Sequence, residues 1–381
     1  MKICCITSFR IPSKAANSIQ VMKVGQALSQ LGHEVVLFTP GHVHTPWKDL
    51  AALYGLTLPF EVIWLPAYAS LKRYDFAVKA VQQAGLRKAD LIYTWLPQAG
   101  LLGVLLGFPV VLEIHDRPTG RLGSWLLRRM AEMRGEKRFA VITRALEQAL
   151  RHEFGIPFKK DEVVIAPNGV DLQRFEQLPA PPEARRQLNL PQQLTAVYSG
   201  HFYAGRGMDL LLGLAQRFPN IHFLWVGGQP DAVESYREVV RMKGLTNVTL
   251  TGFVENQRLP LFQAAGEILL MPYERQIAGS GGGNSADICS PMKMFEYLAC
   301  GRAILASDLP VLHEVLQENN AVFCPPQDLE GWSNALSALV SDLNRIEMLG
   351  KNARETARRF TWVVREEKIL AGFPHREGVK A

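Results

Sequence analysis

A lysine and a glutamate lie three positions apart in the apolar stretch "CSPMKMFEYLACGRAILASDLP", residues 289–310. Ser290 is a good N-cap and Pro291 a good first-turn residue, so we expect a helix to begin there. The free amide groups and the dipole at such a helix start can bind an anion. Lys293 would lie in the first turn, where a cation is unfavourable unless a negative group is also present. Glu296 would share its face of the helix.

This pair has two interpretations. A bound phosphate would resolve the conflict at Lys293, and the carboxylate of Glu296 could accept hydrogen bonds from two sugar hydroxyls. Alternatively, the two residues form an ordinary Lys–Glu pair on a solvated helix face. Spacing alone does not separate these interpretations.

Two glycine-rich segments also carry residue types suited to a ligand. In "YSGHFYAGRG" (198–207), the glycines Gly200, Gly205 and Gly207 allow close backbone approach, and Arg206 could hold a diphosphate by bidentate hydrogen bonds. The loop lacks the dinucleotide-binding fingerprint, and most such loops are only tight turns. The segment "GSGGGNS" (279–285) is interpreted either as a closing lid or as slack chain.

His115 ends the apolar run "PVVLEIH", where an α/β sheet places ligand-contacting residues. A lone histidine is more often structural, so His115 alone does not define a site. The common catalytic motifs are absent: we find no GxSxG, no GxxxxGK[ST], no HExxH and no paired zinc-ligand spacing. A kinase, a hydrolase and a zinc enzyme are therefore disfavoured.

The composition is that of a soluble globular protein long enough for two domains, with 381 residues, of which 48% are hydrophobic and 20% charged. A net charge of +6 suits anionic partners without choosing among them. The five cysteines show no CxxC spacing and are expected to be reduced and mostly buried. We expect neither a signal peptide nor a membrane-spanning segment, so the protein is soluble or at most lies on a membrane.

Short β-branched runs alternate with helix-length amphipathic stretches along the chain. The expected strands cover residues 2–7, 33–39, 61–66, 90–95, 109–115, 139–143 and 162–167, and, after the proline-rich break 178–191, residues 195–200, 221–228, 247–253, 267–273, 302–307 and 321–326. The expected helices of the first half cover 19–31, 74–87, 97–106, 123–135 and 144–154. Apolar runs without alternation are typical of parallel sheets buried on both faces. The fold class is therefore α/β, with two doubly wound, Rossmann-like domains facing each other across a cleft.

Several segments resemble GT-B glycosyltransferases of the large retaining family called glycosyltransferase family 4, and the resemblance covers nearly the whole chain. "ANSIQVMKVGQALSQLGHEVVLFTP" is similar to its first strand–helix–strand unit and "VVIAPNGVDLQRF" to its interdomain junction. "SPMKMFEYLACGRAILASDLP" is similar to its nucleotide-sugar half. The expected domains are residues 1–170, on the acceptor side, and 171–360, which bind the donor; residues 361–381 would pack back on the first domain.

The resemblance implies a role for each donor-site residue. Glu296 would grip the donor ribose, and Arg206 and Lys293 would hold the leaving diphosphate. Phe253 and Val254 would border the base. The other implied donor-binding residues are Gly200, Ser290, Pro291 and Met292.

In the first domain, the resemblance implies that His115 lies against the transferred sugar. Asn17 and Ser18 would stand in for the glycines of the family's first phosphate loop. Departure of the nucleoside diphosphate would be stabilised by Arg206, Lys293 and the start of the Ser-Pro helix, and these two cations and His115 are the expected catalytic residues. No metal or other cofactor is expected. The acceptor hydroxyl would attack on the same face of the sugar, with retention.

Two positions depart from the family pattern. Ile288 stands where many members have a second glutamate, and only the adjacent Asp287 could replace it. His201 stands where many members have arginine, so one cation is missing. These departures keep open a catalytically silent nucleotide-sugar-binding regulator. A two-domain NAD-dependent oxidoreductase would share the architecture, but this sequence lacks the dinucleotide-binding fingerprint of such enzymes.

The expected partners are a nucleotide sugar and a glycan or lipid-linked acceptor, in the synthesis of cell-envelope polysaccharide or glycolipid. The segment "RPTGRLGSWLLRRMAEMRGEKR" (117–138) mixes Arg117, Arg121, Arg128, Arg129 and Arg134 with Trp125, Leu126 and Leu127. It is either a basic amphipathic helix on an anionic membrane or an ordinary surface helix. We therefore expect a cytoplasmic protein, peripheral on the inner face of the membrane if the first interpretation holds. No nucleic-acid-binding module is evident.

Overall fold

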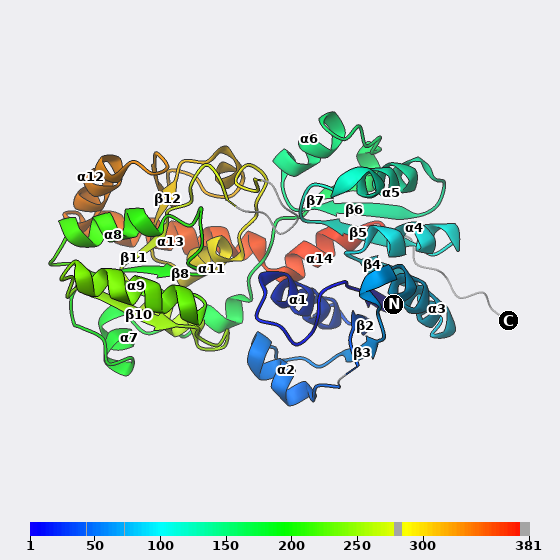
Figure 1. Cartoon of the computed structure of the whole chain (residues 1–381), viewed down its shortest axis with the longest axis horizontal. Helices are drawn as coiled ribbons and strands as arrows, with labels where there is room; N and C mark the ends of the chain where they lie inside the picture. Colours follow the sequence, from blue (N-terminus) through cyan, green and yellow to red (C-terminus); the bar gives the residue numbers. More distant parts are fainter. Residues whose placement is uncertain (43, 72, 278–283, 374–381) are drawn as a thin grey trace. The chain divides into compact units, whose positions relative to one another are not determined.

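The computed structural model describes residues 1–42, 44–71, 73–277 and 284–373, so most of the glycine-rich segment interpreted as a lid lies outside the described residues. The chain divides into two compact units (Figure 1). The first unit contains residues 1–168 and the C-terminal segment from Trp362 onward, and the second contains Gly169–Thr361.

The first unit is built on a parallel sheet with the order β3-β2-β1-β4-β5-β6-β7, seven strands within the described residues. The strands are β1 (Lys2–Ile6), β2 (Glu34–Pro40), β3 (Glu61–Leu65), β4 (Leu91–Thr94), β5 (Val110–Ile114), β6 (Lys137–Val141) and β7 (Val163–Ile165). The helices are α1 (Ala16–Gln30), α2 (Trp47–Tyr54), α3 (Tyr74–Leu86), α4 (Pro97–Leu105), α5 (Gly120–Glu132), α6 (Arg144–His152) and α14 (Trp362–Leu370), with 3₁₀ turns η1 (Ala69–Leu71) and η2 (Lys160–Glu162).

The second unit has a parallel sheet in the order β10-β9-β8-β11-β12-β13, six strands in the part of the chain that the structure describes. The strands are β8 (Thr195–Ser199), β9 (His222–Val226), β10 (Val248–Gly252), β11 (Ile268–Met271), β12 (Ala303–Ser307) and β13 (Val322–Cys324). The helices are α7 (Pro181–Gln187), α8 (Met208–Arg217), α9 (Pro230–Met242), α10 (Leu259–Ala264), α11 (Met292–Cys300), α12 (Leu329–Val340) and α13 (Leu343–Ala357), with 3₁₀ turns η3 (Leu172–Phe175), η4 (Pro310–Glu314) and η5 (Arg358–Phe360).

The predicted α/β class with two parallel sheets is therefore confirmed. Every residue of the central strands β8, β9, β11 and β12 is buried, whereas the edge strand β10 is half-buried along its length. Helices cover the faces of a parallel sheet, so its inner strands need apolar residues on both sides. This requirement explains why uninterrupted apolar runs in the sequence located the strands.

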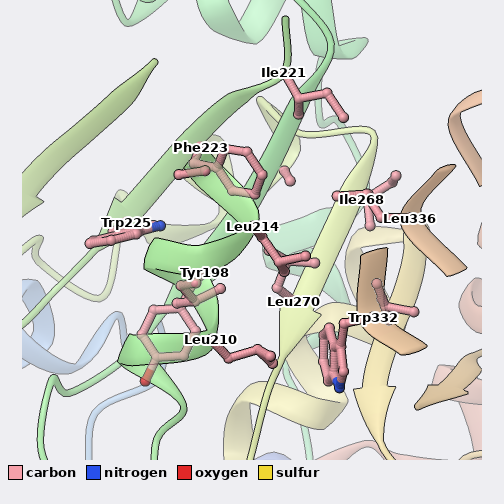
Figure 2. Close-up of a cluster of buried hydrophobic side chains, with 14 of the residues drawn as sticks. Tyr198, Leu210, Leu214, Ile221, Phe223, Trp225, Ile268, Leu270, Trp332 and Leu336 are labelled. Carbon is pink, nitrogen blue, oxygen red and sulfur yellow. The ribbon is translucent and has the colours of Figure 1, made fainter. Parts of the chain in front are cut away.

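The core of the second unit joins its sheet to helices that are distant in the sequence. Figure 2 shows Leu210 and Leu214 of α8 beside strand side chains, with Trp332 of α12 in the same cluster. Trp332 is fully buried, and its indole Nε1 donates a hydrogen bond to the Pro325 carbonyl at 3.1 Å. This core fixes the carboxyl end of β8, where the glycine-rich loop begins.

The interpretation of residues 178–191 as a break between domains is wrong. The segment lies within the second unit and forms α7, with Pro181 at the start of the helix. Proline suits the first helical turn because its φ is already helical and its missing N–H has no partner there. Arg185 of α7 is buried and pairs with Glu267 at 2.8 Å, which anchors the helix to the second unit.

A buried histidine is expected to make the second unit sensitive to acid. His222 is 1% exposed, and its Nε2 lies 2.9 Å from the Thr249 hydroxyl. Burial, and then the charge of Arg185, lower the pKa of His222 from 6.5 to about 4. The unfolded chain therefore binds a proton at a higher pH than the folded chain, so stability should fall as the pH drops from 6.5 towards 4, by about 3 kcal/mol.

Urea unfolding between pH 7 and pH 4 measures this loss. His222→Gln should flatten the dependence, whereas replacing the exposed His152 with glutamine should leave it unchanged. An equally steep loss in His222→Gln would show that other groups cause the acid sensitivity.

Candidate functional site

Helix α11 begins at Met292, and Pro291 occupies its cap position with ψ at 129°, so the prediction that Ser290 caps the helix is wrong. The extended ψ of Pro291 keeps that residue outside the helix and delays the first helical residue. Pro291 itself makes no side-chain capping hydrogen bond. Ser290 is buried in the segment before the helix, and Met292 is half-buried at its start.

The ammonium of Lys293 is buried and has no hydrogen-bond partner among the described residues. It lies 4.0 Å from the ring centroid of Tyr198 and 5.3 Å from that of Tyr273. Burial, and then the nearby charge of Arg206, lower the pKa of Lys293 well below its ordinary value, although Glu296 opposes this effect. A buried, unpaired ammonium is costly, and a bound anion would remove that cost.

The side chain of Arg206 also lies against aromatic rings. Its Cζ lies 4.8 Å from the ring centroid of Tyr203 and 4.7 Å from that of Tyr273, and Nη2 donates to the Tyr203 hydroxyl at 2.5 Å. Arg206 and Lys293 therefore share the Tyr273 ring. Aromatic faces position these side chains without pairing them with a carboxylate, so both stay available for an anionic ligand.

The loop 200–207 requires glycine for two different reasons. A Cβ at Gly200 would lie 2.6 Å from the Lys293 Nζ, so this glycine leaves space for the ammonium. A Cβ at Gly205 would lie 2.3 Å from the Gln276 carbonyl oxygen, and one at Gly207 only 1.9 Å from the carbonyl oxygen of Pro272. Tight loop packing explains these last two, which is the alternative that the sequence left open.

Glu296 belongs to a polar network and does not pair with Lys293 in the part of the chain that the structure describes. The Gln263 Nε2 donates to the Glu296 Oε2 at 3.0 Å and to the Ser199 hydroxyl at 3.2 Å. Glu296 itself is only half-buried. The solvated Lys–Glu pair is therefore the wrong interpretation of these two residues.

The residues expected at the base follow the carboxyl end of β10. Phe253 is 45% exposed directly after Gly252, and Val254 is half-buried. An exposed aromatic ring at this end of the sheet can stack on a flat ligand.

The structure places the residues at the two departures from the family pattern in different environments. Ile288 is 1% exposed and packs as a core residue, while the side chain of Asp287 is exposed. The ring of His201 stacks on Tyr203 with centroids 5.5 Å apart. Burial, together with the charges of Lys293 and Arg206, lowers the pKa of His201, so it does not replace the missing cation.

In the first unit, His115 directly follows β5. Its Nε2 lies 2.8 Å from the Glu113 Oε1, and its side chain is 23% exposed. Asn17 is half-buried in the first turn of α1. The hydroxyl of Ser18 is buried and donates to the Arg10 carbonyl at 3.1 Å, so it ties down the loop that precedes the helix.

Sequence reasoning missed the partners of the site residues. Tyr198 precedes the glycine-rich loop and Tyr203 lies within it, so both could have been noticed there. Tyr273 and Gln263 come from other elements and carry no local signal. Glu113 was visible two residues before His115, but nothing in the sequence showed that it would face the imidazole.

The basic segment forms α5, which begins three residues earlier than expected. Leu122 and Trp125 are 51% and 54% exposed, one turn apart, whereas Leu126 and Leu127 are buried. Arg128 donates to the Phe154 carbonyl at 3.0 Å. Helix α5 therefore packs on its unit with two leucines and leaves a leucine and a tryptophan at the surface.

Among the described residues, no group of three or more His, Cys, Asp and Glu side chains is placed to hold a metal ion. Within the same residues, no helix combines the length and the apolar character needed to cross a membrane.

Family models cover both halves of the chain. The model for Glycosyltransferase Family 4 matches residues 18–174, and the model for Glycosyl transferases group 1 matches residues 193–342.

Individual relatives span nearly the whole chain. It is 24% identical over 384 residues to a phosphatidyl-myo-inositol mannosyltransferase of Mycolicibacterium smegmatis, with 96% of this chain and 91% of that protein covered. It is 22% identical to the sulfoquinovosyl transferase SQD2 of Arabidopsis thaliana, with 90% and 67% covered. The crystal structure of Anabaena HepE in complex with UDP superposes with a TM-score of 0.72 at 18% identity, with 97% and 98% of the chains covered.

Proposed function

Because this chain belongs to glycosyltransferase family 4 and has the two parallel-sheet domains of the GT-B fold, we propose that it transfers a sugar from a nucleoside-diphosphate sugar to an acceptor hydroxyl, with retention. The observation that carries this proposal is the buried ammonium of Lys293, which lacks a partner among the described residues and shares an aromatic ring with Arg206. Two cations held without carboxylates suit a diphosphate. The UDP bound to HepE supports the same class of ligand.

In this mechanism, the bond between the anomeric carbon and the diphosphate oxygen breaks, and negative charge builds on the leaving group. Arg206 and Lys293 stabilise that charge from fixed positions. The acceptor oxygen bonds to the same face of the anomeric carbon, and the leaving phosphate takes its proton. Glu296, oriented by Gln263, would hold the ribose hydroxyls. We propose no metal for these steps.

The proposed acceptor is lipid-linked or a glycan, and the lipid is favoured by the mycobacterial relative, a phosphatidyl-myo-inositol mannosyltransferase. The exposed Leu122 and Trp125 on the arginine-rich α5 suit an anionic membrane surface. We therefore propose a cytoplasmic protein that is peripheral on the membrane. Sedimentation with phosphatidylglycerol vesicles should weaken in the double variant Leu122→Ser, Trp125→Ser, and binding equal to that of the unchanged protein would contradict the membrane role.

A thermal-shift screen against UDP, GDP, ADP, their sugar conjugates and NAD tests the donor. A binder at 100 times its Kd should add about 2.7 kcal/mol of stability. Glu296→Ala should lose the response to the nucleotide, and His115→Ala should keep it while losing transfer. A response to NAD alone would overturn the proposal.

Nucleotide binding is expected to take up a proton at Lys293. The pKa of the free ammonium is lowered, and a bound diphosphate would raise it again by stabilising the charged form. At a pH between these two values, binding adds a proton, so affinity should fall as the pH rises through that window. Calorimetry in two buffers of different ionisation enthalpy measures the uptake. Lys293→Met should abolish it, and an uptake that persists in this variant would assign the proton to another group.

A further inference from the structure

The carboxylate of Glu113 lies fully buried at the centre of a hydrogen-bond network in the first unit. Its Oε1 accepts from the Gln20 Nε2 at 2.7 Å and from the Arg365 Nη2, and it lies 2.8 Å from the His115 Nε2. Its Oε2 accepts from the Tyr93 hydroxyl at 2.9 Å. Contacts from several directions hold this carboxylate in one position.

The counter-charge comes from the far end of the chain. Arg365 lies on α14, which runs beside α1 (Figure 1). Its Nε donates to the Pro167 carbonyl at 2.9 Å, and its Nη1 donates to the Glu366 Oε1 at 2.5 Å. Arg365 is 5% exposed and Glu366 is fully buried. The returning helix therefore supplies the cation that keeps Glu113 in place.

The chemistry of this network decides which nitrogen of His115 carries the proton. Burial by itself raises the pKa of Glu113, but the charge of Arg365 and the hydrogen bonds from His115 and Tyr93 outweigh it, so the pKa lies below its ordinary value. An ionised carboxylate only accepts hydrogen bonds. The His115 Nε2 must then donate, and in the neutral ring Nδ1 is left as the acceptor.

We propose that Glu113 is a positioning residue that fixes the ring orientation and the Nε2–H tautomer of His115, with Arg365 of α14 as its obligatory counter-charge. This inference rests on the proposed function, in which His115 acts on the transferred sugar. It adds Glu113, Arg365 and the docking of α14 to the groups on which transfer depends.

A simpler explanation is that Glu113 and Arg365 only anchor α14, with His115 a bystander at the edge of the ion pair. The two explanations differ when both charges are removed together. Replacing a buried ion pair by apolar residues is often neutral for stability, whereas removing one partner leaves an unpaired charge. Glu366, whose pKa is raised chiefly by burial, can then stay neutral. The double variant Glu113→Leu, Arg365→Met therefore separates anchoring from positioning.

The first measurement is two-bond ¹H–¹⁵N NMR of histidine-labelled protein, with the His115 signals identified by their loss in His115→Gln. In the unchanged protein, the neutral ring should carry its proton on Nε2. In the double variant, the signals should shift to a mixture of both tautomers. A proton on Nδ1 in the unchanged protein, or the same tautomer in both proteins, would overturn the inference.

The second measurement is transfer kinetics. The double variant should lose kcat about 10-fold or more, with its Kd for the nucleoside diphosphate changed less than twofold. The matched control removes the buried Lys137–Glu162 pair, 2.8 Å apart, through Lys137→Met and Glu162→Leu. Lys137 begins β6, at the opposite end of the sheet from His115, so this control should keep both the tautomer and kcat. An equal loss of kcat in both double variants would favour the simple anchor.

Failure of the proposed function gives a different result. If His115→Ala transfers sugar at the normal rate, His115 has no part in the reaction, and the NMR result alone decides whether Glu113 orients the ring. If His115→Ala is impaired but the double variant is not, the site stands and the positioning role of Glu113 is wrong.

Discussion

Lys293→Met should lower kcat/KM for sugar transfer by about 100-fold or more, while raising the Tm of the protein. Removing one donor to a developing negative charge typically costs two to three orders of magnitude in rate. The variant without ligand should be more stable than the unchanged protein, because the buried ammonium that it removes has no partner among the described residues and has its pKa lowered by burial. A gain of 1 kcal/mol in a unit of this size raises Tm by about 2–4 °C.

Lys351→Met is the matched control, because Lys351 is exposed on α13 of the same unit. Differential scanning calorimetry without ligand and initial-rate kinetics should show no comparable change in this variant. A lower Tm in Lys293→Met would show that the ammonium contributes to stability, and normal kcat/KM would remove Lys293 from the site.

Arg365→Met should destabilise the first unit by about 3–5 kcal/mol, the usual cost of leaving a buried charge unpaired. Glu113 is fully buried, and Arg365 is the cation that the structure places against it. The same change also removes the hydrogen bond that ties α14 to the Pro167 carbonyl. Urea unfolding followed by circular dichroism measures the loss of free energy.

The control for this variant is Arg358→Met, which removes an exposed pair with Glu355. Exposed pairs contribute about 1 kcal/mol or less, so this change should have little effect. A similar loss of unfolding free energy in the two variants would mean that the buried ion pair stabilises the protein no more than an exposed pair does. Helix α14 would then be held by its apolar contacts alone.

The sheets and the candidate nucleotide site could largely be predicted from the sequence, because both depend on local patterns. Runs such as "TAVYS" are apolar on both faces, so they form the inner strands of a parallel sheet. Lys293 and Glu296 are three residues apart on α11, so a helix places them on one face. The family and the fold class predicted from these segments are confirmed.

Capping and linker predictions were weaker because neighbours decide between near-equal local conformations. Ser290 and Pro291 are both good residues for a helix start, and the extended backbone at Pro291 decided where α11 begins. The proline-rich segment could be a linker or a helix. The buried pair of Arg185 with Glu267 made it the helix α7.

The sequence by itself determined the strands, the glycine-rich loop and the residue types that could bind a diphosphate, because neighbouring residues control these features. Only the tertiary structure decided the environment of each charge. It placed Tyr198 and Tyr273 around Lys293, and it brought Arg365 to Glu113 across 252 positions of the chain. Charge–ring and charge–charge contacts depend on distance in space, and chain folding sets that distance independently of separation along the sequence.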